Sequence, residues 1–280
     1  MSTAWQKTSV TLPGQGFDLA RPVGIGFIIT AMLPLVILPL ASIFIYSMSK
    51  GPVHFGKALA DPAALFSLRL SLMTSSVATA CNVVFGLLAA YVMTKYHFKG
   101  ESALMIIISL PTAIPTAVAG FALLLLWGRN GLVGQFLEQT DFQVMFTTAA
   151  IILANIFVTF PLAFGVIKPA LENLDTSLED AAETMGASRW QAFRFVVLPS
   201  LRGAIITGAL LTFARSIGEF GSTIMVSGNL PLRTQTAPLY IYAKFNDGQV
   251  ESANAIAAVL AIISFAIFSL ILLTRRKLEK

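Results

Sequence analysis

The chain alternates between long apolar stretches and shorter polar segments. Six stretches hold few or no charges, and each is long enough to cross a bilayer, which takes about 20 apolar residues in a helix. The first stretch has no small-residue cleavage site after it, so it is interpreted as a membrane helix rather than a signal peptide. The pattern predicts an all-α membrane protein, with a transmembrane domain over 23–274 and helices at 23–47, 66–94, 103–127, 144–167, 204–226 and 252–274.

Prolines interrupt the third stretch. Pro111 and Pro115 stand four residues apart, and each is followed by a threonine, Thr112 and Thr116. Proline has no backbone N–H and clashes with the preceding turn, so the helical hydrogen bonds break here. A membrane tolerates such breaks where protein or a water-filled cavity satisfies the backbone. These four residues are therefore expected to face the interior of the bundle and are candidates for a translocation pathway.

Hydroxyl groups recur along the second stretch. In lipid, such side chains bond to the backbone of their own helix, which is one reading of the pattern. Several of them share a helix face, so the other reading is a polar path along the bundle. The residues are Ser67, Ser71, Thr74, Ser75, Ser76 and Thr79.

The polar segment 168–203 lies between the fourth and fifth stretches and reads as two short helices. Thr176 and Glu179 form the sequence pattern of a capping box, which predicts a first helix over 177–185. Gly186 then permits the left-handed conformation that ends a helix. Ser188 begins a second capping box with Gln191, and Pro199 is expected to end the second helix.

The surface of this two-helix loop has a particular composition. Ala181 and Ala182 are expected at the crest of the first helix, where their small side chains allow another protein to approach the backbone. On the second helix Trp190, Phe193 and Val197 fall at i, i+3 and i+7 and form one apolar stripe. The loop is either an ordinary solvated segment or a docking knob for a partner.

Composition supports the membrane assignment and gives an orientation. Hydrophobic residues make up 56% of the 280 residues and charged residues 12%, about half of the share usual in soluble domains. The net charge of +5 comes from scattered basic residues, which does not fit a nucleic-acid-binding face. By the positive-inside rule the two tails, 1–22 and 275–280, and the two-helix loop are expected in the cytoplasm. The residues on that side are Lys7, Arg21, Lys95, Lys99, Lys168, Arg189, Arg194, Arg202, Arg275, Arg276, Lys277 and Lys280, against Lys50, Lys57, Arg129, Arg233 and Lys244 opposite.

The sequence lacks the motifs of a catalytic subunit. It has no Walker A glycine loop, no His-Glu-x-x-His motif, and no nucleophile with a plausible base beside it. Cys81 is the single cysteine, so an internal disulfide and a cysteine-based metal cluster are excluded. His54 and His97 are expected to be solvated in loops. We therefore expect no enzyme activity, no metal site and no bound cofactor in this chain.

Two ionisable residues fall inside the fifth stretch. A charge within the bilayer costs about 2.5 to 3.5 kcal/mol on insertion scales and marks a candidate functional site. Arg215 and Glu219 lie one helical turn apart, so they either neutralise each other or place Arg215 on the path of an anionic solute. Ser222 lies close by in the sequence and is included among the pathway candidates.

Several stretches resemble one family of transport proteins. Asp180-Ala181-Ala182, Gly186 and Val196-Val197-Leu198-Pro199 are similar to the cytoplasmic loop of ABC-transporter permeases, with Asp180 and Val196 in place of the family's usual Glu and Ile. The segments at 115–120, 130–137 and 213–221 look like those of T-type sulfate/thiosulfate permeases, and the resemblance covers about residues 66–274. Molybdate and tungstate permeases share the loop and the segment Gly218–Gly221 and are the alternative.

The resemblance implies a type I ABC importer permease fold and a set of partners. These are two cytoplasmic ATPase subunits that bind ATP and Mg²⁺, a second permease subunit of the W type or a second copy, and an external sulfate-binding protein, all at a bacterial inner membrane. The resemblance assigns docking on the ATPase to Glu179, Asp180, Ala181, Ala182, Gly186, Leu198 and Pro199. A six-helix channel or a membrane sensor remains a further alternative.

Overall fold

A computed structural model of the chain describes residues 20–96, 98–138 and 143–278. The described chain is helical, with no strand in these three ranges. Most of the N-terminal tail, His97 and the last two residues of the C-terminal tail therefore lie outside the described residues.

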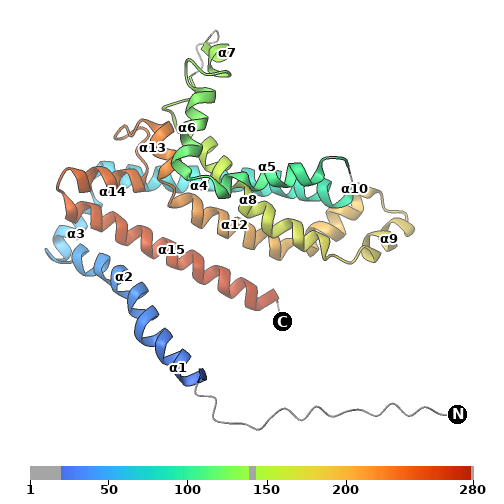
Figure 1. The fold of residues 1–280 in the computed structure, drawn as a ribbon, viewed down its shortest axis with the longest axis horizontal. Helices are drawn as coiled ribbons and strands as arrows, with labels where there is room; N and C mark the ends of the chain where they lie inside the picture. Colours follow the sequence, from blue (N-terminus) through green and yellow to red (C-terminus); the bar gives the residue numbers. More distant parts are fainter. Residues whose placement is uncertain (1–19, 97, 139–142, 279–280) are drawn as a thin grey trace.

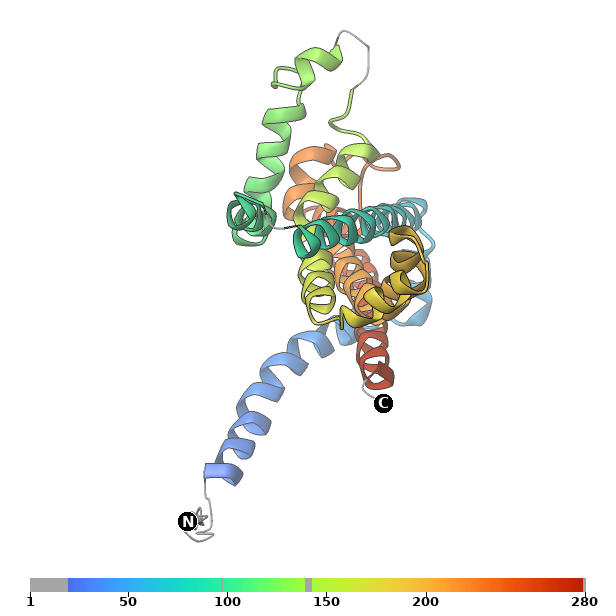
Figure 2. The same ribbon diagram turned by 90° about the vertical axis from the view of Figure 1, so that its right-hand side faces the viewer.

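The first part of the chain forms an apolar helix that extends away from the body (Figures 1 and 2). It comprises α1 (Ala20–Phe27), a π-helical turn η1 (Ile28–Met32) and α2 (Leu33–Ser47), and the short helix α3 (Pro52–Leu59) follows. The stretch Pro22–Ser47 is long and apolar enough to cross a membrane, and none of its most apolar window is buried. The end of α2 contacts α15.

Three long helices form the centre of the body. They are α4 (Pro62–Lys95), α8 (Thr148–Glu172) and α12 (Arg202–Ile217), and each of them contacts the other two. Small residues keep α4 and α8 close, since Ala90 and Ala163 are fully buried and a Cβ on Gly86 would lie 3.3 Å from the backbone nitrogen of Phe164. The long helix α15 (Val250–Leu278) packs beside α12 and α14 (Ala237–Asn246).

The third apolar stretch does not form the single helix expected over 103–127. It is divided into α5 (Glu101–Ala113) and α6 (Thr116–Trp127), whose axes are bent by 113°. Ile114 has an extended backbone because the ring of the following Pro115 disfavours the helical conformation. α5 therefore lies along α8, while α6 and α7 (Gly134–Glu138) point away from the body (Figure 1).

The fifth stretch is also interrupted. The sequence pattern predicts one helix over 204–226, but the structure ends α12 at Ile217 and begins α13 (Gly221–Ser227) after a three-residue break. The break lies at Gly218 and Glu219, where the Glu219 carboxylate accepts a hydrogen bond from the first turn of α13. Among the described residues, four helices are each long and apolar enough to span a membrane. The number is six if each of two bent pairs counts as one span, the pair of α5 with α6 and the pair of the helical segment Arg189–Ser200 with α12.

Candidate functional site: a two-helix loop and a polar helix junction

The polar segment between α8 and α12 folds as two short helices, as predicted. The first is α9 (Ser177–Thr184), and the second combines α10 (Arg189–Ala192), the π-helical turn η2 (Phe193–Val197) and α11 (Leu198–Ser200). Gly186 between them has a φ of 93°, the left-handed conformation that glycine adopts without steric cost. The π-helical turn ends at Val197, two positions before Pro199, whose missing N–H leaves a carbonyl without its usual partner.

One of the two predicted capping boxes is present, and the prediction of the other is wrong. Ser188 Oγ accepts a hydrogen bond from Gln191 N, and the Gln191 side chain accepts one from Ser188 N. Thr176 instead has a helical backbone and makes no capping hydrogen bond. Asp175 replaces it, because its Oδ1 accepts a hydrogen bond from Ser177 N at 2.9 Å. The hydrogen bonds from Ser177 lower the pKa of the Asp175 carboxyl and keep it ionised.

The two alanines of α9 do not share an exposed crest. Ala181 is exposed, whereas Ala182 is 7% exposed and belongs to a helix that contacts α10 and η2 of the second helix. Asp180 and Gly186 are exposed, and Met185 at the tip is 84% exposed. The accessible tip of the loop is therefore formed by Asp180, Ala181, Met185 and Gly186.

The apolar stripe on the second helix is buried at its C-terminal end and exposed at its N-terminal end. Val197 is fully buried with Leu171 and Leu201, and Phe193 packs edge-on against Tyr91 of α4 with ring centroids 5.0 Å apart. Trp190 stacks on Phe193 but is 65% exposed. The inner end of the stripe thus fixes the second helix to the membrane body.

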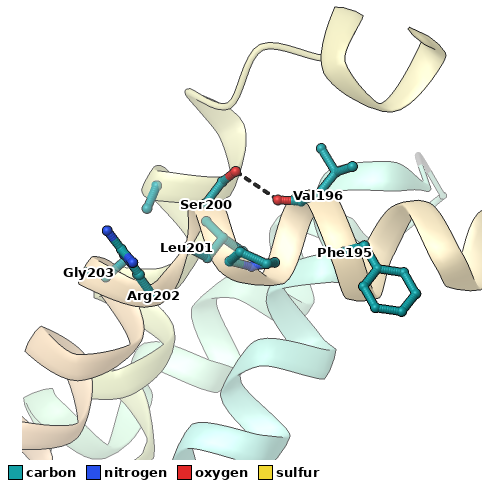
Figure 3. Close-up of a pocket in the computed structure, with 9 residues that line it drawn as sticks. Phe195, Val196, Ser200, Leu201, Arg202 and Gly203 are labelled. Atoms are coloured by element: carbon teal, nitrogen blue, oxygen red, sulfur yellow. Dashed lines mark hydrogen bonds between the residues drawn. The ribbon is translucent and has the colours of Figure 1, made fainter. Parts of the chain in front are cut away.

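An open hollow of about 690 Å³ lies where the loop returns to α12 (Figure 3). Phe195, Val196, Pro199, Arg202 and Gly203 contribute to its lining, and Ser200 Oγ donates a hydrogen bond to Val196 O. Leu198 is half-buried and Pro199 exposed, so of these two predicted docking residues the proline is the accessible one.

Glu179 differs from the other predicted docking residues. Lys95 Nζ, at the end of α4, donates to Glu179 Oε2 at 2.6 Å, and the Glu179 side chain is 15% exposed. The carboxylate therefore faces the membrane body. Nothing in the sequence pairs these two residues, which are 84 positions apart.

The pathway candidates from two distant segments lie together in the structure. α6 packs against α13, and Gly221 lies so close to Thr116 that an added Cβ would be 2.2 Å from Thr116 Oγ1. Pro115 and Thr116 are therefore next to Ser222 and the α12–α13 break. Pro111 is buried at the end of α5, while Thr112 is exposed and donates to Ser109 O.

Arg215 and Glu219 form the ion pair that their spacing suggests. Arg215 Nη1 donates to Glu219 Oε2 at 2.5 Å. Glu219 Oε1 accepts hydrogen bonds from Ser222 N and Ser222 Oγ, both at 2.9 Å. The Glu219 side chain is 1% exposed and that of Arg215 is 42% exposed. The carboxylate is satisfied internally, while much of the guanidinium faces outward.

The hydroxyl groups of α4 point mainly into the helical body. Ser67 and Thr74 bond to backbone carbonyls of their own helix, as one reading of the sequence expects. Ser71 Oγ instead accepts a hydrogen bond from Ala237 N, at the start of α14. One buried contact is not indicated by the sequence pattern: Asn82 Nδ2 donates a hydrogen bond to Thr159 Oγ1 at 2.8 Å and connects α4 with α8.

The fold and the two-helix loop define a class: the membrane-spanning permease of an ABC importer. The chain belongs to the family described as "Binding-protein-dependent transport system inner membrane component", whose profile matches residues 82–278. The predicted all-α permease fold and the inner-membrane assignment are thus confirmed.

Relatives with sulfate in their names are similar over most of the chain. The sulfate transport system permease protein CysT of Salmonella typhimurium is 36% identical over 249 residues, which cover 89% of this chain and 88% of that protein. CysW of Synechococcus elongatus is 36% identical over 86% of this chain and 84% of its own length. Both the T and the W type are therefore similar to this chain.

Solved structures share the fold. A chain in the crystal structure of a bacterial ABC transporter involved in the import of the acidic polysaccharide alginate has a TM-score of 0.71 at 19% identity, and the match covers 92% of this chain and 94% of that one. The inward-facing MetNI methionine ABC transporter contains a chain with a TM-score of 0.54 at 19% identity, over 74% of this chain and 94% of that one.

Proposed function

We propose that this chain is a membrane subunit of an ATP-driven importer that passes sulfate or thiosulfate into the cytoplasm. The sulfate permeases named above support the solute, since they are similar over nearly nine tenths of the chain. The exposed tip of α9 is the observation that supports coupling to an ATPase. It lies at the end of the membrane body and presents a small, acidic surface on which a partner can dock.

The partners follow from the same proposal. Two ATPase subunits bind ATP and Mg²⁺ in the cytoplasm, a second permease subunit completes the pore, and an external binding protein delivers the anion. One structural neighbour is a bacterial alginate ABC transporter in complex with a periplasmic protein bound to an alginate pentasaccharide, which supports a delivery protein. This chain itself binds no cofactor in the proposal.

The proposed orientation places the loop and both termini in the cytoplasm. Five basic residues belong to the loop or to the helix ends next to it: Arg189 and Arg194 lie in the loop, Lys168 near the end of α8, Arg202 at the start of α12, and Lys95 at the end of α4, where it pairs with Glu179. Basic residues are enriched on the cytoplasmic side of membrane proteins, which supports this orientation. The loop then faces the compartment that contains ATP.

Transport requires the loop to respond to the ATPase. In our proposal, ATP closes the ATPase dimer, the docked loop moves with it, and the helices α4, α8 and α12 change between inward- and outward-facing arrangements. A ligand shifts such an equilibrium only through different contacts in the two states. The docked tip at Asp180 and Ala181 supplies those contacts.

Ala181→Glu in reconstituted vesicles tests this function. The larger charged side chain on the exposed tip is expected to prevent ATPase docking, and radiolabelled sulfate uptake is expected to fall to background. Ala182 is unsuitable because it is buried and its replacement disturbs the loop itself. Ala60→Glu introduces the same side chain at an exposed position after α3 and is expected to leave uptake unchanged.

The solute is tested in the same vesicles. Unlabelled sulfate and thiosulfate are expected to compete with the labelled anion, whereas molybdate is not. Strong competition by molybdate alone would replace sulfate with the molybdate alternative. Ala181→Glu complexes that bind the ATPase and import sulfate normally would contradict the docking role of the tip.

A further inference from the structure

A part-buried ion pair connects the first helix of the loop to a membrane helix. Lys95 is the last residue of α4, and its Nζ lies 2.6 Å from Glu179 Oε2 in the first turn of α9. The two side chains are 26% and 15% exposed, so water screens the pair less than it screens a surface pair. The contact therefore holds two elements that are distant in the sequence at a fixed separation.

The surroundings of the pair form a small polar cleft of about 240 Å³. Two bases, Lys95 and Arg189, and two acids, Glu179 and Glu183, contribute to its lining, so the charges balance. Tyr91 and Tyr96 complete the side formed by the end of α4. The Glu179 carboxylate is thus directed into a cleft of this chain, whereas the neighbouring Asp180 is exposed.

The first helix of the loop needs such a connection. α9 has eight residues, fewer than an isolated helix needs to be stable in water. Gly186, with its left-handed backbone, separates α9 from the second helix, which Phe193 and Val197 attach firmly to Tyr91 and Leu171. Lys95 lies one turn beyond Tyr91 on α4. The ion pair therefore attaches α9 to the same end of the same membrane helix.

We propose that the Lys95–Glu179 pair makes α9 and α4 move as one unit, with Glu179 as a positioning residue rather than a contact with the ATPase. This inference rests on the proposed function, because the movement originates at a docked ATPase. It changes the role of Glu179, which the resemblance assigns to docking. In this proposal the ATPase moves α9 through its contacts with Asp180 and Ala181, and the ion pair of Glu179 with Lys95 transmits that movement to α4.

Variants that neutralise one residue of the Lys95–Glu179 pair test the proposal. Lys95→Gln and Glu179→Gln are each expected to reduce sulfate uptake several-fold while the ATPase still co-purifies and hydrolyses ATP. Lys99→Gln, in the turn that follows α4, and Glu183→Gln, in the same cleft, are matched controls, and both are expected to retain uptake. Loss of ATPase co-purification in Glu179→Gln would overturn the proposal and return Glu179 to the docking surface.

Exchanging the two charges distinguishes the effect of the ion pair from the effect of each residue by itself. Lys95→Glu combined with Glu179→Lys restores an attractive pair and is expected to recover uptake above either exchange alone. A double variant no better than the single ones overturns the proposal.

A cross-link tests whether the two elements move together. Cys81 is the single cysteine, so Cys81→Ala provides a background for Lys95→Cys with Glu179→Cys. A short thiol-reactive cross-linker between them is expected to preserve uptake, because joined elements that already move together lose no motion. A cross-linked complex that hydrolyses ATP but imports no sulfate overturns the proposal.

Amide hydrogen exchange of α9 tests the ion pair without any measurement of sulfate transport. Amides of α9 are expected to exchange several-fold faster in Glu179→Gln than in the unchanged complex, and equal exchange overturns the proposal. If the unchanged complex imports no sulfate, the proposed function fails, while the exchange result still decides whether the pair holds α9.

Discussion

Gly120 of α6 and Ser222 of α13 approach so closely that a Cβ on Gly120 would lie 2.5 Å from the Ser222 carbonyl oxygen. The same face carries the reciprocal contact between Gly221 and Thr116. Two glycines therefore bring the proline break of the third stretch against the break between α12 and α13, in which Glu219 lies. This contact assembles the candidate pathway residues from segments about 100 positions apart.

Gly120→Ala is expected to destabilise the chain by about 1 to 3 kcal/mol, because overpacking forces the two backbones apart. Its thermal unfolding in detergent should shift to lower temperature, and uptake should fall with it. Gly165→Ala is the control, since a Cβ at this exposed position of α8 meets nothing within 4 Å. Equal stability of the two variants would contradict the close contact.

Gly186→Ala is expected to cost about 1 to 2 kcal/mol, the penalty of a left-handed backbone for a residue with a Cβ. No atom lies within 4 Å of the added Cβ, so the effect comes from the backbone alone. The ratio of sulfate imported to ATP hydrolysed should fall as α9 loses its orientation. Gly186→Asn should retain more coupling because asparagine tolerates this conformation. Equal ratios for Ala and Asn would argue against a backbone effect.

Arg215→Gln is expected to reduce sulfate uptake about 10- to 100-fold if the guanidinium contacts the anion, because a charged hydrogen bond contributes about 1.5 to 3 kcal/mol. The single variant also leaves the buried Glu219 without its partner, so Arg215→Gln with Glu219→Gln is needed as well. The double variant should stay inactive if Arg215 binds the solute. Recovery of uptake in the double variant would instead make the two residues a structural pair.

The sequence predicts the parts of the fold that depend on neighbouring residues. Long apolar runs locate the membrane helices, and the backbone requirements of Gly186 and Ser188 define the turn between the loop helices. Thr176 fails as a cap because Asp175, one position earlier, offers a carboxylate that reaches Ser177 N first. Local patterns identify a helix start within a residue or so, but they do not decide between adjacent capping groups.

The sequence does not predict contacts between distant segments. Pro115 indicates a break, yet the 113° bend depends on how α5 packs on α8 and α6 on α13. Lys95 and Glu179 are likewise ordinary charges at two helix ends until the fold places them 2.6 Å apart. Such pairs follow from tertiary packing, which charge and periodicity along one chain do not encode.

The most apolar window of Pro22–Ser47 has no buried residue, although the stretch is long enough to cross a membrane. This segment is therefore constrained by its length and by the hydrophobicity of its side chains, rather than by shape complementarity to the rest of the subunit. Substitutions among Leu, Ile, Val and Phe should be interchangeable there, so this segment is free to drift in evolution.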